Sequence, residues 1–138
     1  MTDTLVDTNI LLDVVGRDPS WFEWSRLSLA KAADVGWLVV NPVVYSELAG
    51  KYRSRDELDE MLDQPGFRRE HLSRDAAFAA GVAYVQYRRN GGARTSPLPD
   101  FFIGAHAATR GYRLLTRDRG YYARYFPTVA IISPEPLS

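Results

Sequence analysis

The chain has 138 residues and a mass of 15.6 kDa, which is the size of one domain, and we expect a single domain over residues 1–138. Hydrophobic residues make up 46% and charged residues 25%, so disorder, collagen and coiled coil are excluded as overall descriptions. There is no cysteine, which excludes a disulfide framework, a zinc ribbon, an iron–sulfur cluster and a thiol nucleophile, and the net charge of zero by itself argues against a nucleic-acid binder.

Short apolar strands and helices alternate in the first half of the chain. In order, we predict a strand at 4–6, an apolar run from 10 to 15, a helix from the turn at 18–20 to about 34, a strand at 37–40, a helix starting at 41–42, and a short helix from 54 that stops before 64. Asn41 followed by Pro42 is a strong helix start. Ser20 with Glu23, and Ser54 with Glu57, have the spacing of capping boxes.

The second half continues the same alternation. The predicted elements are a weakly indicated strand at 67–72, an Ala-rich helix capped by Ser73 and running to about 89, a loop at 90–97, a helix that Asp100 opens and that ends near 110, strands at 113–116 and 129–132, and an irregular tail. Strands that alternate with helices of 10–16 residues predict an α/β fold whose parallel sheet is covered on both faces. In such sheets the ligand site lies beyond the carboxyl ends of the strands.

Acidic side chains fall at those carboxyl ends. The candidates are Asp7 after the first strand, Glu47 in the helix after the second, Asp100 at the start of a helix, and Asp118 after the strand at 113–116. Carboxylates that crowd together raise one another's pKa unless a cation compensates them. Magnesium prefers oxygen ligands and keeps several waters, so a few carboxylates are enough to bind it.

Each acid also has a structural interpretation. Asp7 and Asp100 could be helix caps, Asp118 a turn residue and Glu47 a solvated helix residue. These interpretations remain open for each residue taken alone. They do not explain why all of them fall at one edge of the predicted sheet.

Four segments resemble, in order, the acidic motifs of PIN-domain ribonucleases. They are LVDTNILL at 5–12, PVVYSEL at 42–48, PDFFIGAHA at 99–107 and LLTRD at 114–118. The order and spacing match over residues 4–132, and the small size makes the chain similar to VapC-type toxins of bacterial toxin–antitoxin pairs. The resemblance implies a three-layer α/β/α sandwich around a short parallel sheet and an endoribonuclease that uses one or two Mg²⁺ or Mn²⁺ ions.

The resemblance also implies roles for individual residues. Asp7, Glu47, Asp100 and Asp118 match the acidic quartet, with Asp7, Asp100 and Asp118 as metal ligands and Glu47 positioning or deprotonating the attacking water. Thr116 matches the hydroxyl that orients the quartet, and Asn9 a supporting polar residue. The implied partners are an RNA substrate, with tRNA among the candidates, a VapB-like antitoxin and a second copy of the chain.

The charges are distributed unevenly. Residues 88–124 carry eight arginines and two acids, whereas residues 1–87 carry nine basic and fourteen acidic side chains. Arginine suits phosphate, and we expect Arg88, Arg89 and Arg94 to bind the RNA backbone. Genome base composition could account for the preference for arginine over lysine, but not for this clustering.

Other side chains have less to offer chemically. His106 lies six residues after Asp100, so we expect it to be structural, and His71 to be solvated. The aromatic residues Trp21 and Trp24 fit core packing or a groove for a partner.

The sequence leaves two alternative functions open. A DNA nuclease or another Mg²⁺-dependent phosphohydrolase is the alternative enzyme, and a catalytically silent PIN-like binding module is the alternative without activity. No apolar stretch approaches the ~20 residues of a membrane span, and no signal peptide is visible, so we expect a cytoplasmic protein without a membrane partner.

Overall fold

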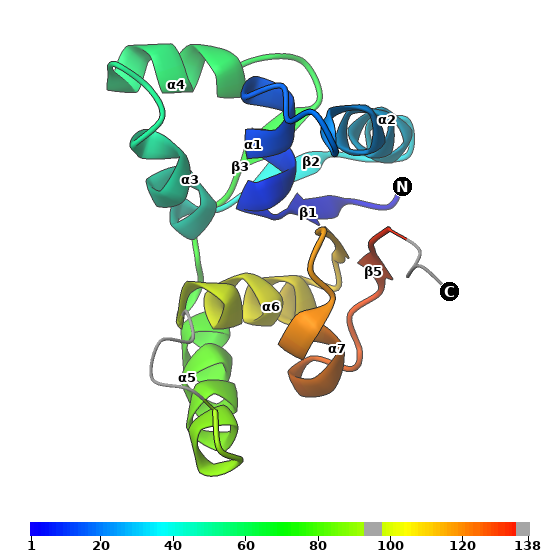
Figure 1. The fold of residues 1–138 in the computed structure, drawn as a ribbon. Helices are drawn as coiled ribbons and strands as arrows, with labels where there is room; N and C mark the ends of the chain where they lie inside the picture. Colours follow the sequence, from blue (N-terminus) through cyan, green and yellow to red (C-terminus); the bar gives the residue numbers. More distant parts are fainter. Residues whose placement is uncertain (93–97, 135–138) are drawn as a thin grey trace.

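Five short strands and seven helices make up the described part of the chain, residues 1–92 and 98–134 of a computed structural model (Figure 1). The elements are β1 (Thr4–Val6), α1 (Thr8–Val15), α2 (Phe22–Ala33), β2 (Leu38–Val40), α3 (Pro42–Ala49), α4 (Arg55–Leu62), β3 (Phe67–Arg69), α5 (Arg74–Arg89), α6 (Leu98–Arg110), β4 (Arg113–Leu115), α7 (Gly120–Tyr125) and β5 (Ile131–Ile132). Arg94, one of the predicted RNA-binding residues, lies outside the described residues.

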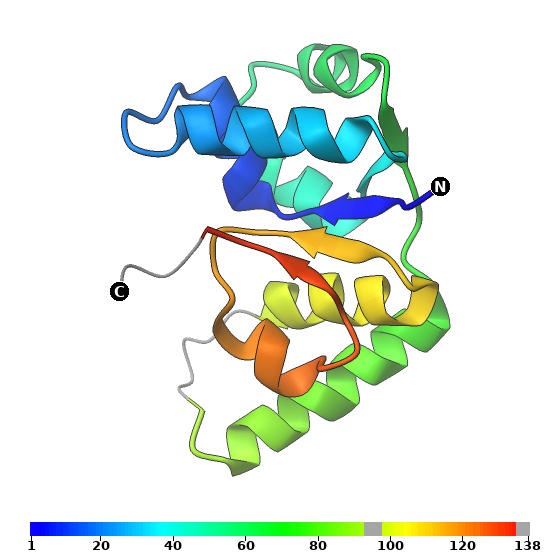
Figure 2. The ribbon, with the colours of Figure 1, turned by 90° about the vertical axis from the view of Figure 1, so that its right-hand side faces the viewer.

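All strands of the sheet run parallel, in the order β3-β2-β1-β4-β5. Figure 2 shows α1, α2 and α4 on one side of the sheet and α5, α6 and α7 on the other. The predicted α/β sandwich with both faces covered is therefore confirmed. Because every strand has the same direction, the segments that follow β1, β2 and β4 start from one edge of the sheet.

Side-chain caps fix most helix starts where the sequence predicted them. Asn41 accepts a hydrogen bond from the Val44 amide at 3.0 Å, and Ser54 and Ser73 cap α4 and α5 in the same way. The capping box predicted at Ser20 is wrong. Asp18 instead accepts from the amides of residues 20 and 21, so α2 begins two residues later than Ser20.

The largest differences from the predicted elements lie around α6 and α7. Helix α6 begins at Leu98, so Asp100 lies in its first turn and is not its N-cap. Helix α7 was not predicted, because six residues are too few for a hydrophobic period to stand out. Its C-terminal neighbour Phe126 packs on Gly104 of α6, where a Cβ would lie 2.4 Å from the ring.

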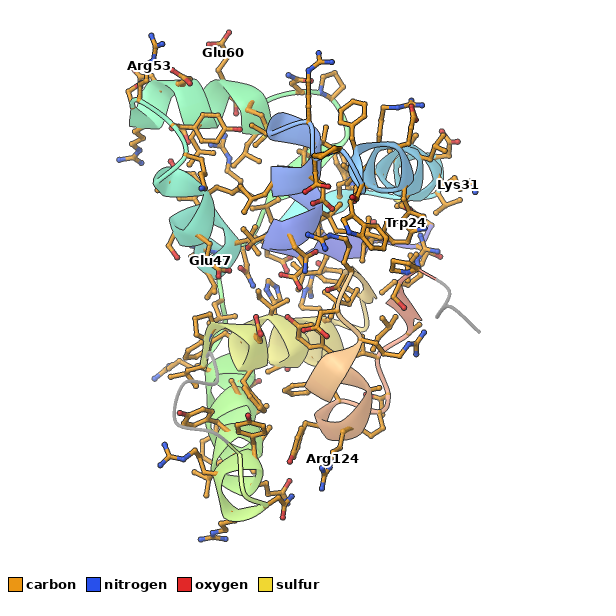
Figure 3. The ribbon with its side chains drawn as sticks, in the orientation of Figure 1. Trp24, Lys31, Glu47, Arg53, Glu60 and Arg124 are labelled. Atoms are coloured by element: carbon orange, nitrogen blue, oxygen red, sulfur yellow. The ribbon has the colours of Figure 1, made fainter. Side chains whose placement is uncertain are left out.

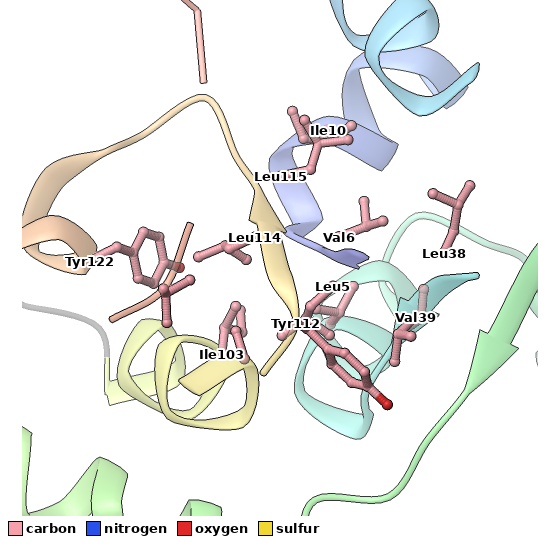
Figure 4. Packing of buried hydrophobic residues seen from close by; sticks show 14 of the residues in the cluster. Leu5, Val6, Ile10, Leu38, Val39, Ile103, Tyr112, Leu114, Leu115 and Tyr122 are labelled. Carbon is pink, nitrogen blue, oxygen red and sulfur yellow. The ribbon is translucent and has the colours of Figure 1, made fainter. Parts of the chain in front are cut away.

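Apolar side chains from both layers cover the central strands (Figure 4). Strand β1 is buried along its whole length because it has a neighbouring strand on each side. Fully buried side chains include Leu5, Val6, Ile10, Leu48, Ile103 and Leu114. The strands are only two or three residues long, so this packing rather than extended pairing holds the layers together.

A buried histidine joins α6 to the far strand of the sheet. His106 is 1% exposed; Asn41 donates to its Nδ1 at 3.1 Å, and its Nε2 donates to Glu70 at 2.6 Å. The Tyr112 hydroxyl also donates to Glu70, at 2.8 Å. The structural role predicted for His106 is thus confirmed.

Replacing Glu70 by Gln is expected to destabilise the fold in a pH-dependent way. Burial disfavours the charge on Glu70, but hydrogen bonds from His106 and Tyr112 and the charge of Arg110 outweigh it and hold its pKa below the ordinary value. A carboxyl with a lowered folded pKa stabilises above its unfolded pKa, and this contribution is lost as the pH falls through the folded pKa. In urea denaturation, Glu70→Gln should cost about 1–2 kcal/mol at pH 7. An equal deficit at pH 3 would contradict this account.

Candidate active site

Asp7, Glu47, Asp100 and Asp118 lie near the edge of the sheet where the strands end, which we call the acidic edge. Asp7 is at its centre. It directly follows β1 and caps α1, where its Oδ1 accepts from the Thr8 amide at 2.7 Å. Its Oδ2 accepts from the hydroxyls of Thr116 at 2.8 Å and Tyr122 at 3.2 Å. The residue is 5% exposed, and this burial raises its pKa despite those donors. The negative charge of Asp7 is therefore unfavourable for the stability of the fold.

Glu47 approaches Asp7 from a different helix. It lies on α3, and its carboxylate accepts a hydrogen bond from the Thr8 hydroxyl at 2.7 Å (Figure 3). Its charge adds to the rise in the pKa of Asp7. Thr8 thus holds Glu47 beside Asp7, although Glu47 itself is exposed to solvent.

Asp100 reaches the same place through Tyr122. The buried Tyr122 hydroxyl interacts with the carboxylates of both Asp7 and Asp100. Burial and these two negative charges raise the pKa of Tyr122, so it stays a neutral hydrogen-bond donor. Tyr122 comes from α7, which therefore helps to shape the acidic edge.

Asp118 lies beside this group on an exposed turn. Its backbone, rather than its carboxylate, is tied to Thr116: the Asp118 amide donates to the Thr116 Oγ1 at 3.0 Å. Its carboxylate lies over Gly120, where a Cβ would be 2.6 Å from Oδ1. Gly120 also has a positive φ of 26°, so a side chain there would be strained as well as crowded.

A clamp of Asp13, Arg117 and Trp21 supports this turn from behind. Arg117 donates two hydrogen bonds to the buried Asp13, at 2.8 and 3.1 Å, and lies 5.1 Å from the centre of the Trp21 ring. Its backbone amide donates to Asn9 at 3.2 Å, and the Asn9 amide group lies 3.4 Å from the Thr116 hydroxyl. The clamp therefore fixes the segment that carries Thr116 and Asp118.

Comparison with known proteins identifies the family of this chain. Residues 4–127 match the PIN domain. The chain belongs to the PIN domain family. Proteins of this family are nucleases, so this PIN domain is assigned to the hydrolases that act on nucleic acids.

Solved structures share the fold over nearly the whole PIN domain. VapBC2 from Rickettsia felis bound to a DNA fragment from their promoter has a TM-score of 0.74 at 17% identity, covering 97% of this chain and 100% of that chain. A toxin–antitoxin complex from Klebsiella pneumoniae has a TM-score of 0.70 at 23% identity, covering 97% and 99%. VapBC-1 from nontypeable Haemophilus influenzae has a TM-score of 0.69 at 15% identity, covering 96% and 98%. No curated protein matched the sequence.

The side-chain atoms at the acidic edge of the PIN domain that could bind a metal are all oxygen atoms. Oxygen ligands suit a hard divalent cation. No group of three or more His, Asp or Glu side chains stands ready to hold a metal within residues 1–92 and 98–134. Nevertheless, Asp7 is buried, ionisable and crowded by Glu47, and Asp100 shares its tyrosine donor. A cation that keeps part of its water shell fits these residues, because it needs few protein ligands and would relieve the repulsion.

Arg88 and Arg89, two of the predicted RNA-binding residues, have different surroundings in the structure. Arg88 and Arg89 are exposed at the end of α5, but Arg88 leans on Tyr84, with 6.0 Å between its guanidinium carbon and the ring centre. Arg89 lines a hollow that it shares with Arg124 of α7.

No helix in the described ranges has the length and apolar character that crossing a bilayer requires.

Sequence reasoning missed Tyr122, Thr8 and the clamp. Tyr122 lies four residues before Phe126, and this spacing was a signal that both buried rings face α6. The aromatic residues of α2 pack within the chain: Trp24 lies against the core, and its ring meets that of Trp21 edge to face at 6.2 Å. These contacts favour the packing interpretation over the partner groove.

Proposed function

We propose that this PIN domain is a VapC-type toxin, an endoribonuclease that hydrolyses RNA phosphodiester bonds with Mg²⁺ or Mn²⁺. The observation that carries the proposal is the buried Asp7 carboxylate with Glu47 and Asp100 gathered about it through Thr8 and Tyr122. Three solved structures that share the fold are described as VapBC proteins or a toxin–antitoxin complex, which supports the toxin assignment.

In the proposed reaction Asp7 and Asp100 would hold the cation, and Asp118 would be a further ligand, either directly or through water. A bound divalent cation would lower the pKa of water and stabilise charge on the scissile phosphate and the leaving oxygen. Thr116 and Tyr122 donate to Asp7 and keep its carboxylate oriented. The exposed Glu47, held by Thr8, receives the proton of the attacking water.

The test is metal-dependent cleavage with three substrate classes. Purified protein is incubated with structured RNAs, single-stranded DNA and a chromogenic phosphate ester, in Mg²⁺, Mn²⁺ or a chelator. We expect RNA alone to be cut, and only with a divalent cation. Cleavage of DNA with equal efficiency would favour the alternative nuclease, and no cleavage of any substrate would favour a silent binding module.

The proposed partner in the cell is a VapB-like antitoxin, and the proposed location is the cytoplasm. Co-expression with the product of an adjacent small reading frame is expected to give a stable complex with little Mg²⁺-dependent ribonuclease activity. Full activity in that complex would contradict the inhibitory role.

A second copy of the chain is the other proposed partner, and α5 offers a surface for it. Phe78, Val82 and Val85 are 76%, 49% and 47% exposed on one side of this helix, and nothing lies within 4 Å of a Cβ built at Gly81 between them. Antiparallel pairing centred between Gly81 and Val82 would set Phe78 against Val85 of the other copy, the self-complementary arrangement of a two-fold interface. We expect Phe78→Asp to shift the mass measured by light scattering from dimer to monomer, whereas Leu27→Asp on α2 should not.

A further inference from the structure

A groove crosses the surface between the carboxyl end of α5 and α7. It consists of two adjoining hollows that share Asn90, Arg124 and Tyr125. One hollow, of about 410 Å³, reaches Gly120, and the other, of about 570 Å³, reaches Arg89. Since Gly120 lies against the Asp118 carboxylate, the groove begins at the acidic edge and leads away from it.

The charge of this α5–α7 groove is opposite to that of the acidic edge. Arg89 and Arg124 are exposed, and neither has an ion-pair partner within residues 1–92 and 98–134. The described residues that line the groove include no aspartate or glutamate. Two uncompensated guanidinium groups therefore face the same channel, which attracts anions.

Arg124 is held in position by its neighbours. Its guanidinium carbon lies 5.4 Å from the centre of the Tyr125 ring, and Asn90 donates to the Tyr125 hydroxyl at 3.3 Å. The Tyr125 ring also contacts Tyr87 and Phe101, with 5.8 and 5.7 Å between ring centres. Because the Tyr125 ring is itself held in place, the Arg124 guanidinium that lies on it loses less conformational freedom when it binds a ligand.

Helix α7 is a wall shared by the groove and the acidic edge. Tyr122 points to the carboxylates of Asp7 and Asp100, while Arg124 and Tyr125 line the groove. In Figure 3 Arg124 lies below α7, in the lower part of the molecule. A strand with one phosphate at the carboxylates would thus have a cationic channel for the phosphates next to it.

We propose that the α5–α7 groove binds the RNA backbone beside the scissile phosphate, with Arg89 and Arg124 contacting phosphates. The inference rests on the proposed ribonuclease function and adds Arg124, Asn90 and Tyr125 to its substrate site. RNA fits better than an acidic protein segment, because the groove is continuous with the acidic edge and Arg124 covers the ring that could anchor an apolar side chain. Backbone contacts of this kind carry no sequence information.

The test measures binding separately from cleavage. A fluorescein-labelled single-stranded RNA of random sequence is titrated by anisotropy, without divalent cations, over a range of salt concentrations. Arg89→Gln and Arg124→Gln should each weaken binding about tenfold at low salt and reduce the slope of log K against log salt by about 0.7, the value for one phosphate contact on a single strand. Arg124→Lys should keep the slope but bind more weakly than wild type, since it lacks the planar contact with Tyr125.

Arg53→Gln is the matched control, because Arg53 is also exposed but lies at the opposite end of the molecule (Figure 3). It should change neither affinity nor slope. In cleavage assays the groove variants should raise KM and leave kcat within about twofold.

Two outcomes would contradict the proposed binding of RNA in the groove, and a third would contradict only the proposed ribonuclease activity. Slopes for both groove variants equal to that of Arg53→Gln would show that the groove does not bind RNA. Weaker binding of an oligoglutamate peptide to these variants, with unchanged RNA binding, would assign the groove to an acidic protein partner. Wild-type protein that binds RNA with the expected slopes, but cuts nothing in Mg²⁺ or Mn²⁺, would retain the groove and refute the ribonuclease.

Discussion

Asp7→Asn is expected to abolish cleavage while leaving the fold intact. The loss should be roughly 10³-fold or more, since a cation worth several kcal/mol in the transition state would lose a charged ligand. The fold should persist because asparagine also caps helices and keeps an oxygen for the Thr8 amide. Burial disfavours the charge on Asp7, so removing it relieves a cost, but the amide NH2 cannot accept from the hydroxyls of Thr116 and Tyr122 as Oδ2 does, and the stability should therefore change by no more than about 1 kcal/mol.

Thermal unfolding provides a readout for Asp7→Asn that does not depend on activity. Mn²⁺ should raise the Tm of the wild type by mass action and leave the Tm of the variant nearly unchanged. Asp34→Asn is the control, because Asp34 is exposed at the end of α2, away from the acidic edge. Equal stabilisation of wild type and variant by Mn²⁺ would remove Asp7 from the metal site.

Asp13→Ala is expected to cause the largest loss of stability, about 3 kcal/mol. The substitution leaves the half-buried Arg117 without its two hydrogen bonds and Ser25 without the acceptor that it reaches at 2.7 Å. Breaking one side of a buried ion pair typically costs 3–5 kcal/mol, and the 30% exposure of the Arg117 side chain places this case at the lower end. Cleavage should fall mainly through kcat, because the turn with Thr116 and Asp118 would lose its support.

A double-mutant cycle separates the ion pair from general damage to the core. Asp13→Ala, Arg117→Ala and the combined variant are compared by urea denaturation. We expect the two effects to be non-additive, with a coupling energy of about 1.5 kcal/mol or more. Additive losses would mean that Asp13 and Arg117 act independently and that the clamp does not exist in solution.

The acidic edge could be predicted because it follows from backbone direction. Strands that run parallel deliver the residues after them to one edge, so Asp7, Asp118 and the helix with Glu47 could be placed from sequence order alone. What joins these acids could not be predicted. Thr8 and Tyr122 act through hydrogen bonds between residues 39 and 115 positions apart, and such distances leave no periodic signal in the sequence.

The start of α2 and the whole of α7 were missed for local reasons. Ser20 and Asp18 are both good caps, and the choice between them depends on how the chain turns after α1. Helix α7 has six residues, too few for a hydrophobic period to stand out. It is stabilised by Phe126 against Gly104 instead, a contact visible only once α6 and α7 are adjacent.

The layered architecture divides the acidic residues between two parts of the chain. Asp7 and Glu47 belong to the segment before α5, and Asp100 and Asp118 to the segment after it, while the pairing of β1 with β4 joins the two (Figure 2). Neither segment alone contains a complete set of carboxylates. The proposed set of carboxylates would therefore be complete only when both segments are folded together, with β4 paired beside β1.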